Sequence, residues 1–201
     1  MFGKSKTEVP RKKSVFREYA EIISMAVVLA FFVRAFFIQA FRIPSESMED
    51  TLLVGDFLFA NKLIYGPKVP FTEKRLPGVR DPEPGDIIIF KYPGDKKTDY
   101  IKRCVAVEGQ SVELKGRTLY VDGVPQKEDY TKYYHGSQFG PYTVPKDHIF
   151  MMGDNRDNSA DSRVWGPLPK DLILGKAMFI YFSWSSGDKV IRFARIGDII
   201  R

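Results

Sequence analysis

The chain has 201 residues, which is enough for a membrane anchor followed by one medium domain or two small ones. Its net charge of +6 is concentrated in the first seventeen residues, and the rest of the chain is nearly neutral. This distribution excludes a broad nucleic-acid-binding surface and indicates a signal for membrane topology. The single cysteine, Cys104, excludes an intrachain disulfide and a metal site built on cysteines.

Residues 22–41 form the only long apolar run of the sequence. As a helix that rises about 1.5 Å per residue, this run reaches about 30 Å, the thickness of one hydrocarbon core. Arg34 lies in its last third, so the long side chain can carry its charge toward the headgroups. We expect residues 21–41 to be a membrane anchor, with residues 1–20 as a basic cytoplasmic tail and the remainder on the outer face.

A cleaved secretory signal is the alternative for this region, with residues 22–33 as its apolar stretch. The basic region before that stretch is long, and no small-x-small cleavage site follows it. Retention as a single-pass anchor is therefore the favoured interpretation.

After the anchor, short apolar runs alternate with Gly, Asp and Pro turns, and helical periodicity is almost absent. Residues 66–85 are dense in proline and glycine, which predicts a long loop or an irregular hairpin. The pattern predicts a mostly β fold, in which an N-terminal transmembrane helix precedes an antiparallel β-rich domain. Strands are expected within 51–65 and at 87–90, 100–107, 111–114, 118–121, 149–152 and 176–182.

The heptapeptide Arg-Ile-Pro-Ser-Glu-Ser-Met, residues 42–48, follows the apolar run without a linker. If Pro44 keeps the backbone extended, Ser45 and Ser47 share one face and Glu46 points the other way. One hydroxyl could then attack a substrate while the other stabilises the intermediate that forms. The alternative is a helix N-cap at Ser47, with an acidic residue three positions later.

Residues 99–107 form an apolar strand that carries two adjacent cations, Lys102 and Arg103. Adjacent strand residues face opposite sides, so one of these cations is expected to be sequestered if both faces of the sheet are covered. The alternative is an edge strand whose lysine protects against aggregation.

Residues 153–163 are rich in Asp and Asn, which is compatible with an ordinary surface turn. A calcium loop is excluded, because Arg156 and Trp165 stand where that loop requires an oxygen ligand and a bidentate glutamate. A turn remains that presents the hydroxyl of Ser159 and is anchored by Asp–Arg pairs.

Together the three segments fit a hydrolase with a serine nucleophile and a lysine base. A lysine is a base only when neutral, and at its reference pKa about one amine in 2,500 is neutral at pH 7. Burial that lowers the pKa to about 8 raises this fraction to about a tenth. Ser159 would orient the amine of Lys102, Ser47 would attack a carbonyl, and Ser45 with the backbone N–H of Ser47 would stabilise the oxyanion.

Four segments of the chain resemble, in the family's order, the successive motifs of bacterial type I signal peptidases. They are Pro44–Met48, Gly85–Pro93, Tyr100–Arg103 and Gly153–Arg163. The resemblance extends from the anchor to about residue 182. It implies a membrane-bound serine endopeptidase that removes signal peptides from exported precursors after small residues, at Ala-x-Ala sites.

The resemblance also implies residue roles. Ser47 matches the nucleophile, Lys102 the general base, Ser45 the oxyanion donor and Ser159 the residue that orients the lysine. Supporting ion pairs are implied for Asp161 with Arg163 and for Arg103 with Asp154. The substrate pockets would be lined by Phe41, Ile43, Met48, Tyr100 and Ile101. Ordinary core packing is the alternative for these residues, and some of them could serve both roles.

Further implications concern domains and partners. The catalytic core would comprise residues 42–108 and 148–201, with residues 109–147 as a small β insertion. The enzyme would lie in the bacterial plasma membrane, contact precursors and lipid, and require no cofactor, metal or nucleic acid. One departure is visible: Asp50 stands where the family usually has proline, so a changed local turn, and not a loss of activity, is expected there.

Three other functions remain as alternatives. The first is a Ser/His/Asp hydrolase that uses His135 or His148, the two histidines of the chain. The second is a membrane-tethered β domain without enzymatic activity that binds envelope partners. The third is a self-cleaving Ser/Lys regulator, which the anchor and the lack of a DNA-binding pattern disfavour.

Overall fold

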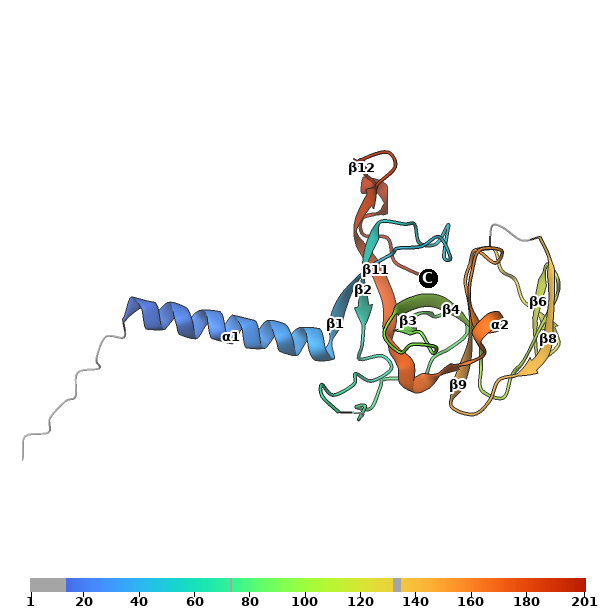
Figure 1. Ribbon diagram of the computed structural model, residues 1–201, viewed down its shortest axis with the longest axis horizontal. Helices are drawn as coiled ribbons and strands as arrows, with labels where there is room; N and C mark the ends of the chain where they lie inside the picture. Colours follow the sequence, from blue (N-terminus) through green and yellow to red (C-terminus); the bar gives the residue numbers. More distant parts are fainter. Residues whose placement is uncertain (1–13, 73, 132–134) are drawn as a thin grey trace, which may run out of the picture.

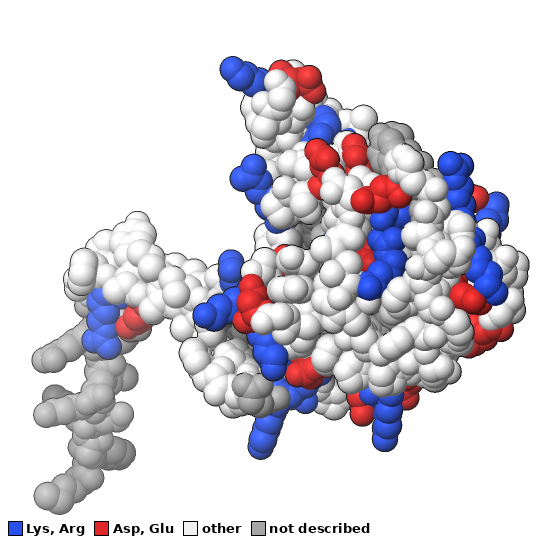
Figure 2. All heavy atoms as spheres, turned by 45° about the vertical axis from the view of Figure 1, so that its right-hand side comes forward, with Lys and Arg blue, Asp and Glu red and all other residues white. Residues whose placement is uncertain are grey.

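The computed structural model describes residues 14–201, apart from residue 73 and residues 132–134. It consists of one long helix, α1 (Val15–Phe36), and a β domain from which this helix projects as a separate rod (Figure 1). Figure 2 shows the middle of this rod without charged side chains, which are scattered instead over the β domain. Among the described helices, α1 is the one long and apolar enough to cross a membrane.

The helix ends earlier than the apolar run predicts. It stops at Phe36, and β1 (Ile38–Arg42) pairs antiparallel with β2 (Asp56–Asn61). Lys62 follows β2 and donates from Nζ to the carbonyl oxygen of Arg34 at 3.0 Å, which satisfies a carbonyl group of the last helical turn. The end of the apolar run therefore forms a strand of the β domain and not membrane helix.

The large sheet holds eight strands, and every pairing in it is antiparallel. Along the sheet the order is β1-β2-β11-β3-β4-β9-β10, and β12 pairs with β11. The strands not yet bounded are β3 (Ile87–Lys91), β4 (Asp99–Val107), β9 (His148–Met152), β10 (Leu168–Pro169), β11 (Ile173–Ser185) and β12 (Val190–Ile191). The long β11 joins the two halves, because it pairs with both β2 and β3.

A smaller sheet of four strands lies at the end of the domain away from α1 (Figure 1). Its order is β7-β6-β5-β8, with bounds Ser111–Gly116 for β5, Thr118–Val121 for β6, Val124–Pro125 for β7 and Ser137–Thr143 for β8. It shares a buried apolar cluster with β4 and β9, in which Val112 and Leu114 pack with Phe150 and Met152. The short helices are α2 (Ser162–Trp165), η1 (Lys170–Leu172) and η2 (Phe193–Arg195).

The predicted fold class is confirmed: the chain is mostly β, with one N-terminal apolar helix. Alternation of apolar residues and turn residues predicted strands at the places of β3, β4, β5, β6, β9 and β11. Residues 52–54 are an exception, since they form a loop in which Leu52 is fully buried in the core. Strand β8 has no strong alternating pattern and was not predicted.

Two buried aspartates tie loops to the large sheet. Asp56 is bound by Arg195, and Asp86 accepts hydrogen bonds from Tyr65, Arg80 and Lys176. Burial of Asp86 raises the pKa of its carboxyl, but these three donors outweigh that effect and hold the pKa well below its usual range. Both aspartates are therefore anchors of the framework that carries the site.

Candidate active site

The segment with the two candidate serines lies in the loop between β1 and β2. Ile43 is fixed at its start, because its N–H donates to the carbonyl oxygen of Asp56 at 2.8 Å. Beyond Pro44 the backbone bends and then turns, with the N–H of Leu52 bound to the carbonyl oxygen of Met48 at 2.7 Å. The expected extended conformation and the alternative helix cap are thus both wrong for this segment.

The turn nevertheless keeps the two hydroxyls together, since Oγ of Ser45 lies 3.5 Å from Oγ of Ser47. Asp50 follows in the same turn with φ of +30°, a value that the ring of proline does not allow. This backbone is therefore incompatible with the family's usual proline at that position.

The side chain of Lys102 enters this region from β4. Its Nζ donates to Oγ of Ser47 at 2.6 Å and to the carbonyl oxygen of Ile101 at 3.0 Å. Lys102 is only 4% exposed, and Ser47 is 8% exposed. Burial lowers the pKa of Lys102 to about 8, although the carboxylates of Asp161 and Asp154 favour its charged form. About one amine in ten is therefore neutral at pH 7.

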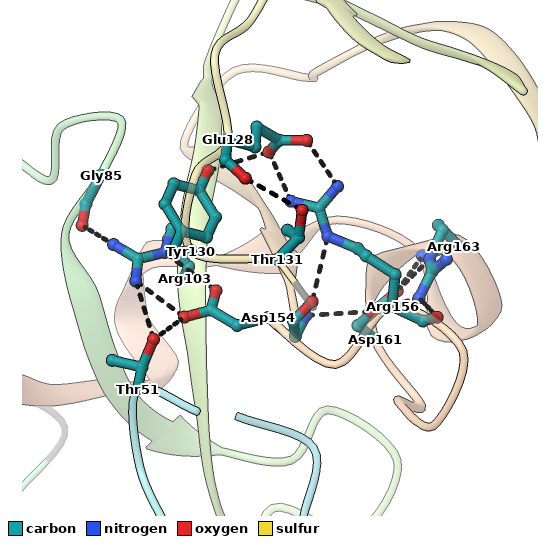
Figure 3. Close-up of polar contacts among 11 residues, drawn as sticks. Thr51, Gly85, Arg103, Glu128, Tyr130, Thr131, Asp154, Arg156, Asp161 and Arg163 are labelled. Carbon is teal, nitrogen blue, oxygen red and sulfur yellow. Dashed lines mark hydrogen bonds and ion pairs between the residues drawn. The ribbon is translucent and has the colours of Figure 1, made fainter. Parts of the chain in front are cut away.

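The strand that carries Lys102 is central and not an edge, because β4 lies between β3 and β9. The interpretation of Lys102 as a protective lysine of an edge strand is therefore wrong. Arg103, its neighbour on β4, is buried as well. It binds Asp154 with two contacts, 2.9 Å from Nε to Oδ1 and 2.7 Å from Nη2 to Oδ2 (Figure 3). Thr51 donates to the same carboxylate at 2.6 Å.

Asp161 and Arg163 form the second predicted ion pair, with Nε–Oδ1 and Nη2–Oδ2 distances of 2.8 Å each. The carboxylate of Asp161 also accepts the backbone N–H of Gly153 at 3.0 Å, and that of Arg163, the second residue of α2. Asp161 therefore fixes both ends of the Asp/Asn-rich turn to each other.

Ser159 lies in this turn, next to Gly153. A Cβ atom built on Gly153 would lie 2.3 Å from Oγ of Ser159 and 2.5 Å from the carbonyl oxygen of Ser47. Only glycine allows this close approach of the turn to the Ser47 segment. Oγ of Ser159 is buried and has no hydrogen-bond partner among the described residues. Its role in orienting Lys102 stays a prediction.

A groove of about 320 Å³ opens over Ser45, Ser47 and Lys102. Tyr100 and Ile101 line both this groove and a pocket of about 30 Å³ beside it. The remaining residues of the groove are Pro44, Glu46, Thr98, Asp99, Asn158 and Ala160. A larger hollow of about 520 Å³ surrounds Tyr65 and Lys170 and includes neither Ser47 nor Lys102 in its lining.

Four of the five expected pocket residues line these hollows, because Phe41 and Ile43 face the small pocket. Met48 lines neither of them and is fully buried in an apolar cluster with residues of β2, β3, β4 and β11. For Met48 the structure therefore supports the alternative of core packing.

The two histidines lie elsewhere. His135 is strongly exposed, and its Nδ1 lies 2.6 Å from Oδ2 of Asp157, while Nδ1 of His148 lies 2.7 Å from the carbonyl oxygen of Lys146. Within the described part of the chain, neither ring is hydrogen-bonded to Ser47. The geometry supports Lys102, and not a histidine, as the base.

Sequence reasoning missed Glu128, Tyr130 and the pairing of Arg156. Arg156 binds Glu128 through both terminal nitrogens, and Tyr130 lies over the guanidinium of Arg103 (Figure 3). A buried arginine needs an anionic partner, so the presence of Arg156 in the Asp/Asn-rich turn was the available signal for this ion pair. Spacing along the chain does not identify Glu128 as the partner.

Comparison with known proteins decides the family. The family model described as "Signal peptidase, peptidase S26" matches residues 16–184. The chain belongs to this family. It is a serine peptidase, and its resemblance to type I signal peptidases is confirmed.

Individual members of the signal peptidase family are similar over most of their length. Signal peptidase I of Pseudomonas fluorescens is 34% identical over 94% of this chain and 81% of its own. Signal peptidase I P of Bacillus subtilis subsp. natto is 36% identical over 90% of this chain and 97% of its own. A crystal structure of a signal peptidase I from Enterococcus faecalis matches 49% of this chain and 98% of its own, with 29% identity and a TM-score of 0.44.

Proposed function

We propose that this peptidase removes N-terminal signal peptides from exported precursor proteins, with Ser47 as nucleophile and Lys102 as general base. The observation that carries this proposal is the 2.6 Å contact between the two side chains, both of which line the groove. The lowered pKa of Lys102, about 8, supports the role of a base near neutral pH. The signal peptidases among its relatives support the class of substrate.

In the proposed reaction, Oγ of Ser47 attacks the carbonyl carbon of the scissile bond while its proton passes to the neutral amine of Lys102. The hydroxyl of Ser45 and the backbone N–H of Ser47 donate to the oxyanion. Collapse of this intermediate breaks the C–N bond, and the ammonium of Lys102 returns the proton to the departing amine. Water, deprotonated by Lys102, then releases the signal peptide from Ser47.

The hollows support selection of small residues before the cut. The precursor would lie extended in the groove over Ser45 and Ser47. Its small side chains would enter the pocket of about 30 Å³, whose walls are Phe41, Ile43 and Tyr100. Alanine fits such a volume, whereas larger side chains would displace buried walls.

The proposed location is the bacterial plasma membrane. Helix α1 would cross it once, with the N-terminus in the cytoplasm and the β domain outside. The strand β1 follows α1 directly, so the groove over Ser47 would face the surface where signal peptides emerge. We assign catalysis to residues 42–108 and 148–201, and treat residues 109–147, which include the small sheet, as an insertion.

The test is processing of an exported precursor with an Ala-x-Ala site by the full chain in detergent. We expect Ser47→Ala and Lys102→Ala to abolish cleavage, while a His135→Gln/His148→Gln variant keeps it. Mass spectrometry of the products identifies the cut. Equal processing by the wild type and both single variants would refute the assignment, and loss of cleavage in the histidine variant would favour a Ser/His mechanism.

A further inference from the structure

Residues 127–131 run between β7 and β8, outside both sheets, and contact the active-site turn. Glu128 in this segment accepts from Nη1 of Arg156 at 2.7 Å, and from Nη2 as well (Figure 3). The Arg156 side chain is 1% exposed and that of Glu128 is 8% exposed. This bidentate pair is thus almost completely removed from water.

Arg156 connects Glu128 to the turn that contacts the Ser47 segment. Its Nε donates to the carbonyl oxygen of Gly153 at 3.1 Å, and Gly153 touches both Ser159 and the backbone of Ser47. Asn155, the residue before Arg156, donates its backbone N–H to the carbonyl oxygen of Ser47 at 3.2 Å. Glu128 is therefore separated from the Ser47 segment by one side chain and one turn of backbone.

The same segment also holds the second buried arginine. The hydroxyl of Tyr130 donates to Oε1 of Glu128 at 2.8 Å, and the centroid of its ring lies 3.8 Å from Cζ of Arg103. Burial and the Glu128 carboxylate raise the pKa of Tyr130, so its hydroxyl stays a donor. Arg103 in turn binds Asp154, the neighbour of Gly153 in the turn.

Stability alone is a weak explanation for such an arrangement. Replacing a buried ion pair with apolar side chains of similar volume is often neutral or stabilising. The pair does, however, fix the orientation of the Gly153 carbonyl group. The planar guanidinium of Arg156 donates to Glu128 through its terminal nitrogens and to the carbonyl oxygen of Gly153 through Nε.

We propose that Glu128 is a positioning residue, which acts through Arg156 to hold the turn of residues 153–159 against Ser47. Segment 127–131 thereby links the small sheet to the geometry of the nucleophile. This inference rests on the proposed role of Ser47, and it assigns a catalytic consequence to a segment that contacts no substrate groove.

The decisive variant is Glu128→Leu/Arg156→Met, which removes both charges and keeps apolar volume. We expect it to fold with a melting temperature close to that of the wild type, and to lower kcat for precursor cleavage between tenfold and about a hundredfold. KM should change less than threefold, because neither residue lines the groove. Glu128→Asp in the wild-type background should restore part of the rate relative to Glu128→Ala.

Asp129→Asn is the matched control, because Asp129 lies in the same segment with its side chain 73% exposed. It should keep the wild-type kcat. A double variant with wild-type melting temperature and wild-type kcat would overturn the proposal, as would a loss confined to KM.

Hydrogen exchange supplies a readout that needs no substrate. In the double variant, the amides of residues 153–159 should exchange at least tenfold faster, while those of β3 and β4 keep their protection. Unchanged exchange in this turn would overturn the inference even if Ser47 is the nucleophile. Faster exchange in the turn, combined with full activity of Ser47→Ala, would leave the positioning contact intact and refute the proposed function instead.

Discussion

Nζ of Lys102 lies 2.6 Å from Oγ of Ser47, although 55 residues separate them in the chain. The contact depends on two features of the fold: residues 101–106 of β4 are buried, and the loop between β1 and β2 brings Ser47 to Lys102. Because the amine is removed from water, its pKa falls from 10.5 to about 8, which raises the fraction of neutral amine relative to a lysine in water. The same burial lowers the free energy of unfolding while Lys102 is protonated.

Replacing Lys102 with methionine should stabilise the protein in a pH-dependent way. The pKa of Lys102 is about 8 in the folded chain and 10.5 when unperturbed, so the unfolded state binds more protons between these values. Wild-type stability should therefore rise from pH 8 to 10.5. The advantage of Lys102→Met should be about 3 kcal/mol larger at pH 7 than at pH 11. Thermal unfolding of both proteins in detergent measures this difference in stability. A difference that does not depend on pH would contradict the prediction.

Ser45→Ala should lower kcat by about 10²-fold to 10³-fold with little change in KM, because the hydroxyl would donate only to the oxyanion. The position of the hydroxyl, 3.5 Å from Oγ of Ser47, supports this role. Steady-state kinetics with a precursor peptide measure the effect, with Ser186→Ala in the exposed turn after β11 as control. Retention of full kcat by Ser45→Ala would remove Ser45 from the oxyanion site.

Gly153→Ala should lower both activity and stability. Its Cβ would lie 2.3 Å from Oγ of Ser159 and 2.5 Å from the carbonyl oxygen of Ser47, so the turn must move away from the nucleophile. We expect a loss of about 1–3 kcal/mol in the free energy of unfolding, as for other overpacked sites. Gly187→Ala is the control, because no atom lies within 4 Å of its Cβ position. Equal behaviour of the two variants would show that the close approach is unimportant.

Asp154→Ala should be strongly destabilising, because it leaves the guanidinium of Arg103 buried without its anion. Breaking such a pair typically costs about 3–5 kcal/mol. Chemical denaturation followed by circular dichroism measures the loss, and Asp129→Ala, on the surface, should cause no measurable change. A loss no larger than that of the surface variant would mean that Arg103 finds other compensation.

Much of this architecture follows from local sequence. Alternation and turn residues predict β3 and β4, and adjacency on β4 separates Lys102 from Arg103. The end of α1 is not predictable in this way, because residues 38–41 continue the apolar run and form a strand by pairing with β2. Tertiary pairing overrides the local pattern there.

The site itself is only partly local. Ser47 and Lys102 were identified by motifs, but spacing along the chain does not give the distance between them. Met48 shows the limit, since its apolar side chain fits a substrate pocket and the core equally well, and the structure places it in the core. The partner of Arg156 could also not be predicted, because Glu128 lies 28 residues away in a segment without regular structure.

The dependence of kcat/KM on pH tests the central claim most directly, with a precursor substrate between pH 6 and pH 10. The account predicts a tenfold rise per pH unit below an apparent pKa of about 8 and a plateau above it, in the wild type and in the His135→Gln/His148→Gln variant alike. A profile governed by a pKa of about 6.5, lost when the histidines are replaced, would contradict it.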